Sequence, residues 1–442
     1  MSGIAEVLLN LGYTVSGSDL KMTPITERLV RLGATVYEGH AASNVGAAKA
    51  LVVSSAVDEQ NPEVQEARRR QIPVIPRGEL LAELMRLKFG IAVAGSHGKT
   101  TTTSMIAAIF SGLGLDSTVV VGGRSAAMGG SNARVGKSEF LIVESDESDR
   151  SFLKLAPIIA VVTNIDREHL DCYQSLDDIR NSFTEFINKV PFYGAAILCL
   201  DDSNVRGVLP QVKRRKITYG RSPQADIEIS EVSCEQRSSG FRLRFRSKDL
   251  GRFCVKAPGP HNVLNATAAV GVALELDQKP DAIREALATF SGVDRRFQIR
   301  GVERGVTVVD DYGHHPTEIR ATLESARLGG YRRILVLFQP HRYTRTKFLM
   351  DDFAGAFHQS DRLYLMDIYA ASESPIEGVT AEALAARARA AGHKSVEFVG
   401  SMEKGVAAIA EAAEEGDLIL TLGAGNVSQA GDKILDSLRG RK

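Results

Sequence analysis

91-IAVAGSHGKTTTT-103 is the stretch that decides the fold, because an apolar run ends there in a glycine turn and opens onto a threonine-rich helix start. Gly95, Gly98, Lys99 and Thr100 give the pattern G-x-x-G-K-T, two residues shorter than the common phosphate loop. Glycines let backbone N–H groups approach phosphate oxygens, a lysine supplies a point charge, and a threonine can bind Mg²⁺. The stretch therefore predicts a nucleotide site between a strand and a helix; a glycine turn beside a solvated lysine is the alternative.

Short β-branched runs alternate with helical stretches on both sides of this turn, which is typical of parallel sheets in an α/β fold. Strands are expected at residues 13–19, 35–39, 51–56, 72–76, 91–95, 140–145, 158–164, 196–200, 306–313, 334–340, 363–369, 396–400 and 418–425. Residues 226–259 are expected to form antiparallel strands instead. The pattern divides the chain into three groups, at residues 1–85, 86–293 and 294–442.

The composition is that of an ordinary globular protein. Its 442 residues favour two or three domains, and a hydrophobic content of 44% is enough for a sizeable core. Lys+Arg and Asp+Glu are both 54, so no net positive field favours nucleic acid or an anionic membrane. The four cysteines form no CxxC pair, and no apolar run is long enough to cross a bilayer. We expect free thiols and a cytoplasmic protein without membrane insertion.

Acidic residues and a histidine follow two of the expected strands. Glu144, with Asp146, Glu147 and Asp149 behind it, ends the strand at 140–145, and His169 follows the strand at 158–164. Carboxylate oxygens at neighbouring strand ends suit Mg²⁺. A helix cap or a solvated turn explains the acidic residues equally well when the phosphate loop is left aside, and a lone histidine is more often structural.

The beginning of the sequence departs from a usual nucleotide-binding unit. Residues 1–10 are expected to form a helix, with a strand ending at Asp19, whereas such a unit normally starts with a strand and a glycine turn. Only Ser2-Gly3 could be the remnant of that turn. Either the chain starts late, at an internal methionine, or this domain is built differently. We favour the late start and expect a first domain that lacks its first strand.

These pieces together resemble the Mur ligase family. The matching stretches are 95-GSHGKTTT-102, 144-ESDESD-149, 163-TNIDREHLD-171, 259-GPHNVLNA-266, 295-RRF-297, 310-DDYGHHP-316, 338-FQPHRYTRT-346 and 423-GAGN-426. The resemblance implies a Rossmann-like UDP-sugar domain over residues 1–85 and a P-loop ATPase-type ATP domain over 86–293. The latter is expected to have a mostly parallel sheet with a small antiparallel part. A Rossmann-like ligase domain is implied over 294–442.

The resemblance also implies a reaction in peptidoglycan synthesis. ATP activates the lactyl carboxylate of UDP-N-acetylmuramate as an acyl phosphate, and the amine of L-alanine displaces phosphate from it. The implied partners are ATP, Mg²⁺ and these small molecules, with no nucleic acid, in a monomer or homodimer. A recycling ligase that adds a preformed peptide is the nearest alternative, and Tyr312-Gly313-His314-His315 favours alanine modestly. A P-loop ATPase or non-catalytic binding protein is the other alternative, and it leaves His341, Arg342 and Arg345 unexplained.

Site residues follow from the resemblance position by position. ATP is expected at Gly95, Ser96, His97, Gly98, Lys99, Thr100, Thr101, Asn262, Asn265, Arg296 and Asp311. Metal is expected at Thr100, Glu144 and His169, and catalysis at Lys99, His169, His314, His341 and Arg345. Substrate binding is expected at Asp19, Ser54, Ser55, Tyr312, His314, Arg342 and Arg345.

Several of these residues could instead have a purely structural role. The two asparagines could cap a helix, residues 341–345 could be a solvated basic loop, and Asp19 could be a turn residue. The choice of Arg296 and Asp311 could slip by one residue to Arg295 and Asp310.

Three departures from the family pattern stand out. Residues 176–188 contain no lysine that could be carbamylated, which fits an alanine-adding member, and Glu168 replaces the usual aspartate. The absent first strand would remove the glycine turn that approaches a pyrophosphate. We therefore expect an intact ATP site but impaired binding of the UDP-sugar if the chain begins at residue 1.

Overall fold

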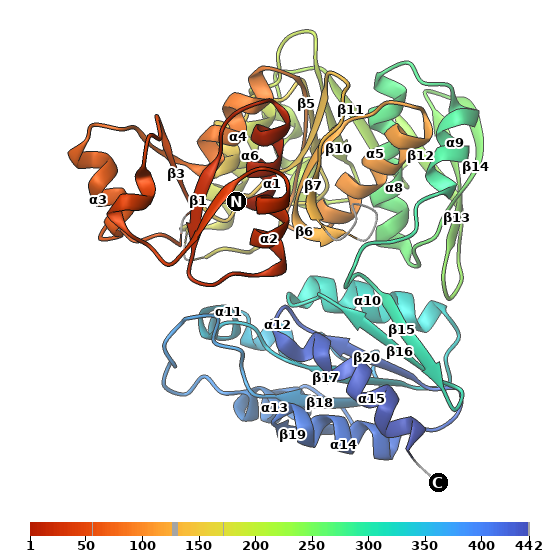
Figure 1. The fold of residues 1–442 in the computed structure, drawn as a ribbon. Coiled ribbons are helices and arrows are strands. Elements are labelled where there is room, and N and C mark those ends of the chain that lie inside the picture. Colours follow the sequence, from red (N-terminus) through yellow and green to blue (C-terminus); the bar gives the residue numbers. More distant parts are fainter. Residues whose placement is uncertain (55, 126–130, 171, 441–442) are drawn as a thin grey trace. The chain divides into compact units, whose positions relative to one another are not determined.

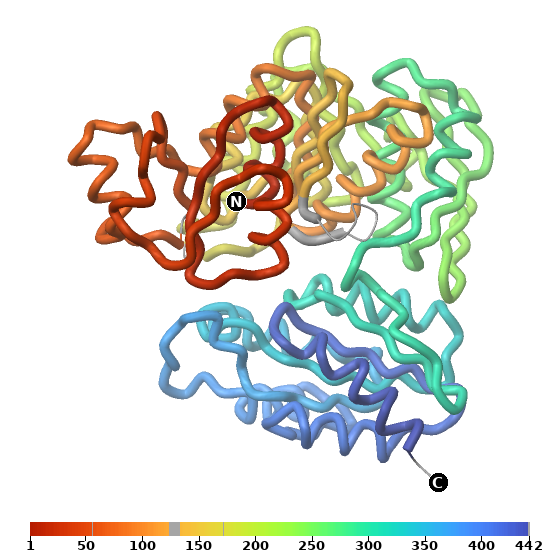
Figure 2. Tube along the Cα trace, viewed as in Figure 1, coloured from red at the N-terminus to blue at the C-terminus, as the bar shows by residue number. Residues whose placement is uncertain are grey.

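Helices and strands alternate along nearly the whole chain in the computed structural model, which describes residues 1–54, 56–125, 131–170 and 172–440 (Figure 1). The chain separates into two units, whose path is traced in Figure 2. Unit 1 contains Met1–Asp166, Leu176–Ile227 and Ala268–Ala286. Unit 2 contains Arg167–Ser175, Glu228–Thr267 and Leu287–Lys442.

A mostly parallel sheet forms the centre of unit 1. Seven strands of this ten-stranded sheet lie in the order β11 (Lys216–Gly220), β10 (Ala195–Cys199), β9 (Ile159–Val162), β5 (Phe89–Ala94), β8 (Phe140–Glu144), β6 (Thr118–Ser125) and β7 (Ser131–Arg134). β5 pairs in parallel with both β8 and β9, and of these seven strands only β7 runs antiparallel, against β6. The loops after β5, β8 and β9 therefore leave the same edge of the sheet, where a ligand is expected in an open α/β fold.

Helices pack against this sheet through apolar side chains. α5 (Lys99–Gly112) follows the glycine turn and buries Ile106, Ile109 and Phe110 completely. The Phe110 ring meets the Phe140 ring of β8 edge to face, with centroids 5.3 Å apart. This packing fixes the start of α5 at the sheet edge. Unit 1 also contains α4 (Arg77–Arg86), α6 (Leu176–Asn188), α7 (Ser203–Val208) and α9 (Pro280–Ala288).

The first part of unit 1 contains two short parallel strand pairs. The helix expected at the start is confirmed as α1 (Ser2–Asn10). β1 (Ser16–Asp19) pairs with β2 (Thr35–Glu38), and β3 (Leu51–Val53) pairs with β4 (Val74–Pro76). The accompanying helices are α2 (Pro24–Arg31) and α3 (Pro62–Arg69).

Unit 2 includes the antiparallel strands that the sequence predicts within residues 226–259. They are β12 (Ile227–Cys234), β13 (Ser239–Phe245) and β14 (Lys248–Val255), and β13 pairs antiparallel with β14. α8 (Pro260–Glu275) follows them.

A second sheet carries the C-terminal part of unit 2. Its order is β15 (Gln298–Glu303), β16 (Val306–Asp311), β20 (Leu418–Leu422), β17 (Ile334–Phe338), β18 (Arg362–Met366) and β19 (Val396–Gly400). Only β15 is antiparallel to its neighbour. Side chains alternate between two apolar clusters, so Val336 and Phe338 belong to one and Leu335 and Leu337 to the other.

Helices on this sheet complete both clusters. α10 (Pro316–Leu328), α12 (Met350–Ala354) and α13 (Ala381–Ala390) contribute to the first cluster, and α14 (Met402–Ala412) and α15 (Ala430–Arg439) to the second. The short α11 (Tyr343–Phe348) follows β17. Burial on both faces explains why the parallel strands are almost wholly apolar in sequence.

Two further expectations concern the whole chain. Cys172, Cys199, Cys234 and Cys254 are all free, as the sequence predicts. Among the described residues, no helix has the length and apolar character needed to cross a membrane.

Candidate nucleotide and ligase site

Glycine is required at both ends of the phosphate loop that follows β5. Gly95 has φ +138°, and a Cβ there would collide with the hydroxyl of Thr163. Gly98 has φ +81° and immediately precedes α5. Side-chain-bearing residues rarely adopt such a backbone. The two glycines of the sequence motif therefore shape the turn itself.

The segment after β9 holds the loop in place through hydrogen bonds. The backbone N–H of His97 donates to Asn164 Oδ1 at 2.8 Å, and Asn164 Nδ2 donates to His97 O at 3.0 Å. The N–H of Asp166 donates to Ser96 Oγ at 2.8 Å, and the Asp166 carboxylate lies 3.0 Å from His97 Nε2. The side chains of Ser96 and His97, both predicted to bind ATP, thus also anchor the loop in place.

Lys99 is the cation of the loop. Its ammonium donates to Gly95 O at 2.7 Å and to Ser96 O at 3.2 Å, and it pairs with Glu147 Oε1 at 2.6 Å. The Glu147 side chain is 5% exposed, so this pair is shielded from solvent and its attraction is stronger than at the surface. The contacts hold one positive charge at the loop.

Thr100 and Glu144 meet at the same sheet edge. Thr100 Oγ1 donates to Glu144 Oε1 at 2.9 Å, and the second carboxylate oxygen accepts from Gly122 N at 2.8 Å. A hydroxyl and a carboxylate are hard oxygen donors, so this pair fits Mg²⁺. Thr101, the next residue, is buried in α5. The third predicted metal residue, His169, belongs to unit 2.

Asn262 and Asn265 lie inside α8, so neither occupies the position before its first residue. Asn262 Nδ2 donates to Pro258 O at 2.7 Å, and Asn265 Nδ2 donates to Asn262 Oδ1 at 3.3 Å. Desolvation and, after it, the charge of Arg296 together lower the pKa of His261 beside them to about 4. No role was assigned to this neutral histidine from the sequence, although it lies within one of the stretches that match the family.

The neighbouring residues Asp310 and Asp311, which are alternative candidates for binding ATP, have different contacts in unit 2. Arg295 Nε pairs with Asp310 Oδ2 at 3.1 Å. The Asp311 carboxylate accepts from Phe297 N and from Gly313 N, both at 2.7 Å. Burial raises the pKa of Asp311 to about 6. Asp311 therefore links the turn after Arg296 to the loop after β16. The contacts do not decide whether Arg295 or Arg296, or whether Asp310 or Asp311, binds ATP.

Histidines and arginines from separate loops come together in unit 2. Arg345 Nη1 lies 3.1 Å from His341 Nδ1, and Arg345 Nη2 donates to Glu168 Oε1 at 3.1 Å. The rings of His314 and His341 have centroids 6.0 Å apart, and His314 Nε2 lies 3.6 Å from Glu168 Oε1. The Tyr312 ring meets the His314 ring edge to face at 5.2 Å. The predicted amino-acid pocket residues are therefore one cluster.

His341 is neutral at physiological pH. Burial, followed by the charges of His314, Arg345 and Arg342, lowers its pKa to about 3. Its ring stacks on Tyr369 at 5.6 Å with an interplanar angle of 9°. Because Arg345 can only donate, Nδ1 of His341 is the acceptor of their contact.

A pocket lies beside this cluster. It is lined by Arg167, Glu168, His169, Leu170, Arg342, Thr344, Arg345, Phe348 and Leu349. The backbone of Arg342 has φ +70° and donates to Tyr369 O at 2.9 Å, and its side-chain Nε is buried without a hydrogen-bond partner among the described residues. A guanidinium held this way can recognise a carboxylate. Glu168 also lines this pocket, although the sequence marked it only as a departure from the family's usual aspartate.

The residues expected to bind the UDP-sugar lie at strand ends in unit 1. Asp19 ends β1 and is exposed, and Ser54 directly follows β3. Ser55 lies outside the described residues. Ser18 was not predicted, yet its hydroxyl contacts His40 Nδ1 and Glu63 Oε2, both at 2.9 Å. No spacing in the sequence relates residues so far apart.

Known proteins are similar to this chain over nearly its whole length. Models described as the Mur ligase family catalytic domain, the Mur ligase middle domain, and the Mur ligase glutamate ligase domain match residues 1–89, 93–273 and 295–425. The UDP-N-acetylmuramate–L-alanine ligase of Solibacter usitatus is 72% identical, covering 99% of this chain and 93% of the relative. The enzyme of that name from Koribacter versatilis is 58% identical, covering 100% and 96%.

A solved structure agrees in fold. The UDP-N-acetylmuramate-alanine ligase of Thermotoga maritima matches with a TM-score of 0.81 and 26% identity, covering 100% of this chain and 97% of that one. Matches to three successive domain models and to nearly full-length relatives leave a single assignment: the chain belongs to the Mur ligase family.

Proposed function

We propose that this chain is an ATP-dependent, ADP-forming ligase that joins L-alanine to the lactyl carboxylate of UDP-N-acetylmuramate in peptidoglycan synthesis. The observation that carries the proposal is the cluster of His314, His341 and Arg345, because a plain ATPase has no use for it. Relatives at 53% to 72% identity that bear the name of this ligase support the same assignment.

The reaction has two chemical steps. A lactyl carboxylate oxygen attacks the γ-phosphorus of ATP, which forms an acyl phosphate and releases ADP. The alanine amine then attacks the acyl carbon, loses a proton, and expels inorganic phosphate from the tetrahedral intermediate. Both reactants of the first step are anions, so their approach requires cationic groups between them.

Unit 1 supplies groups suited to the first step. Lys99 brings a positive charge to the γ-phosphate, and the glycine turn offers backbone N–H groups. Thr100 and Glu144 would hold Mg²⁺, which neutralises phosphate charge when it is bound. His169 is the candidate for a second ion.

Unit 2 supplies groups suited to the second step. The Arg345 guanidinium can bind the alanine carboxylate, with Arg342 beside it in the pocket lining. His314 Nε2 can accept the proton that the attacking amine loses. His341, neutral and oriented by Arg345, can donate a hydrogen bond from Nε2 to the developing oxyanion.

The remaining assignments belong to the same proposal. The domains span residues 1–85 for the UDP-sugar, 86–293 for ATP and 294–442 for ligation, and the matched segments 1–89, 93–273 and 295–425 support these boundaries. Asp19, Ser54 and Ser55 contact the UDP moiety. Asn262, Asn265, Arg296 and Asp311 contact ATP. The protein acts in the cytoplasm as a monomer or homodimer.

One assay tests the proposal. The protein is incubated with ATP, Mg²⁺, UDP-N-acetylmuramate and single amino acids, and phosphate release is measured. Release that requires both the sugar nucleotide and L-alanine is expected. Release without either would identify a plain ATPase, and a requirement for a tripeptide in place of alanine would identify a recycling ligase.

A further inference from the structure

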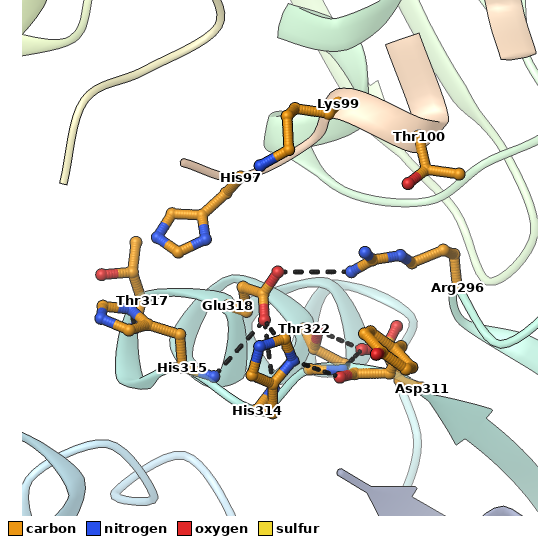
Figure 3. Close-up of polar contacts among 12 residues, drawn as sticks. His97, Lys99, Thr100, Arg296, Asp311, His314, His315, Thr317, Glu318 and Thr322 are labelled. Atoms are coloured by element: carbon orange, nitrogen blue, oxygen red, sulfur yellow. Dashed lines mark hydrogen bonds and ion pairs between the residues drawn. The ribbon is translucent and has the colours of Figure 1, made fainter. Parts of the chain in front are cut away.

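The carboxylate of Glu318 joins two groups of the proposed site (Figure 3). Its Oε2 accepts from the backbone N–H of His314 at 3.1 Å and lies 3.3 Å from His314 Nδ1. Its Oε1 pairs with Arg296 Nη1 at 3.3 Å. The side chain is 10% exposed, so these charges are held away from bulk water.

A purely structural role accounts for part of this geometry. Glu318 is the third residue of α10, and with His315 it forms a capping box at the helix start. A capping box needs an oxygen for the backbone N–H of the residue before the helix, and that contact is 3.4 Å here. Neither the Arg296 pair nor the contact to the His314 ring is needed for capping. They point to a second role.

The surroundings of His314 fix where its proton can be. Nδ1 faces Tyr312 O at 3.0 Å and Glu318 Oε2 at 3.3 Å, and both atoms are acceptors. Nδ1 therefore carries a hydrogen in the neutral ring as well as in the cation, and the proton that is exchanged sits on Nε2. Nε2 is the atom on the Glu168 side, at 3.6 Å.

In the neighbouring His315, the ring nitrogen that carries the hydrogen is the other one. Its Nδ1 accepts from Thr317 N at 3.3 Å, so its hydrogen is on Nε2, 3.3 Å from Arg167 O. The consecutive histidines are thus held in different tautomers by one helix start. Glu318 contacts the ring of His314 but only the backbone N–H of His315.

We infer that Glu318 is a positioning residue that, together with Tyr312 O, holds His314 in the Nδ1–H tautomer and that orients the Arg296 guanidinium. Resting on the proposed function, this role leaves Nε2 of His314 ready to take the proton of the alanine amine. Arg296, which the proposed function assigns to ATP, has its guanidinium 5.2 Å from the centre of the Tyr312 ring. The Glu318 carboxylate therefore contacts both a residue proposed to act on the alanine amine, His314, and a residue proposed to bind ATP, Arg296.

Glu318→Gln separates the two roles. Glutamine serves a capping box as glutamate does, so a merely structural residue tolerates the change. The variant loses the negative charge that orients Arg296 and His314. We expect kcat to fall about 10-fold to 100-fold, the range typical of groups that orient a reacting residue, with KM for UDP-N-acetylmuramate within about twofold. Glu324→Gln, an exposed site on the same helix, is the matched control and should retain wild-type kcat.

The tautomer is measured independently of turnover. A ¹⁵N-histidine NMR spectrum, with the His314 signals identified by their loss in His314→Asn, should show Nδ1–H in the wild type and a mixture in Glu318→Gln. A wild-type Nε2–H tautomer, or unchanged kcat in a folded Glu318→Gln variant, would overturn the inference. Wild-type protein without alanine-dependent phosphate release would refute the proposed function instead, and the spectrum would still decide the tautomer.

Discussion

Lys99 places one ammonium among the carbonyl oxygens of its own loop and the carboxylate of Glu147. This environment explains how a lysine can stay ordered beside the proposed phosphate site, since its charge is neutralised locally. Phosphoryl transfer asks the protein mainly for position and charge, so the ammonium is the group whose removal should matter most in unit 1.

Lys99→Ala should lower alanine-dependent phosphate release by about 100-fold or more, the scale of losing one charge-stabilising donor. Circular dichroism should show an intact fold. Lys216→Ala, an exposed lysine of β11, is the control and should retain full activity. Turnover of Lys99→Ala near that of the wild type would contradict the assigned role.

Arg345→Lys tests recognition of the amino acid. Lysine keeps the charge but not the planar fork that can bind a carboxylate through two hydrogen bonds. We expect KM for alanine to rise about 10-fold or more while the affinity for ATP is unchanged. A proportional loss of both affinities would show that Arg345 supports the fold rather than alanine.

His341 should give the stability of the protein a pH dependence. Its pKa in the folded protein is about 3, below the ordinary value of 6.5, so the folded state binds fewer protons between these values. The contribution of His341 to the free energy of unfolding is therefore complete above about pH 6.5 and is lost as the pH falls toward 3. Urea unfolding across this range should show a shallower pH dependence in His341→Gln than in the wild type or in the exposed-site control His358→Gln.

Sequence could identify these side chains but not their partners. The stretches 310-DDYGHHP-316 and 338-FQPHRYTRT-346 gave Tyr312, His314, His341 and Arg345 by resemblance, and the structure groups them. Glu168 and Glu318 were not assigned to the site, because the contacts of Glu168 and the Arg296 pair of Glu318 depend on tertiary packing. Glu318 had one local signal, since proline and glutamate in 315-HPTE-318 mark a helix start.

At the scale of elements, the turn between β5 and α5 is the part most strictly specified by sequence. The left-handed glycines, the apolar strand before them and the buried helix after them agree with one another. The central parallel strands were predictable for the same reason, since β9, β10 and β17 are short apolar runs buried on both faces. The need for glycine in this turn can be tested by adding a single Cβ atom.

Gly95→Ala should disrupt the phosphate loop, because the added Cβ meets Thr163 and the backbone has φ +138°. We expect a loss of about 1–3 kcal/mol in the free energy of unfolding and ATP affinity at least about tenfold weaker. Gly114→Ala provides the comparison, since φ is +74° but nothing lies within 4 Å of the new Cβ. That variant should lose stability modestly and bind ATP normally; equal ATP affinities in the two variants would contradict the explanation.

Other elements escaped prediction for identifiable physical reasons. β15 and β7 are edge strands paired antiparallel, and β15 (298-QIRGVE-303) has one buried face at most, so its sequence lacks the apolar run of a central strand. β6 contains a Gly-Gly pair, and β11 begins with an exposed lysine. Such strands are specified by their neighbours rather than by their own residues.

At the scale of the molecule, the C-terminal sheet of unit 2 depends on burial on both of its faces. Phe338 is fully buried and packs against the rings of Phe353 and Phe357, with centroids 5.7 and 5.0 Å away. Its strand leads directly into Gln339, Pro340 and His341. Core packing and the position of a proposed catalytic histidine are therefore linked through one strand.

Phe338→Ala should reduce the free energy of unfolding by about 3–5 kcal/mol, through lost apolar burial and the cavity left behind. Phe192→Ala, at a position 88% exposed, should change it by no more than about 0.5 kcal/mol. Denaturant titrations of both variants make the comparison. Equal losses would show that the packing of this sheet contributes little to stability.

The whole chain is neutral, with 54 basic and 54 acidic residues, so its cationic groups act locally and not through a global field. The central claim is that such groups let a carboxylate take the γ-phosphate of ATP before an amine replaces it. Oxygen atoms record this exchange directly. With ¹⁸O in both lactyl carboxylate oxygens of UDP-N-acetylmuramate, the mechanism predicts one ¹⁸O in each phosphate released and one kept in the amide. Phosphate free of the label, with its new oxygen taken from water, would contradict it.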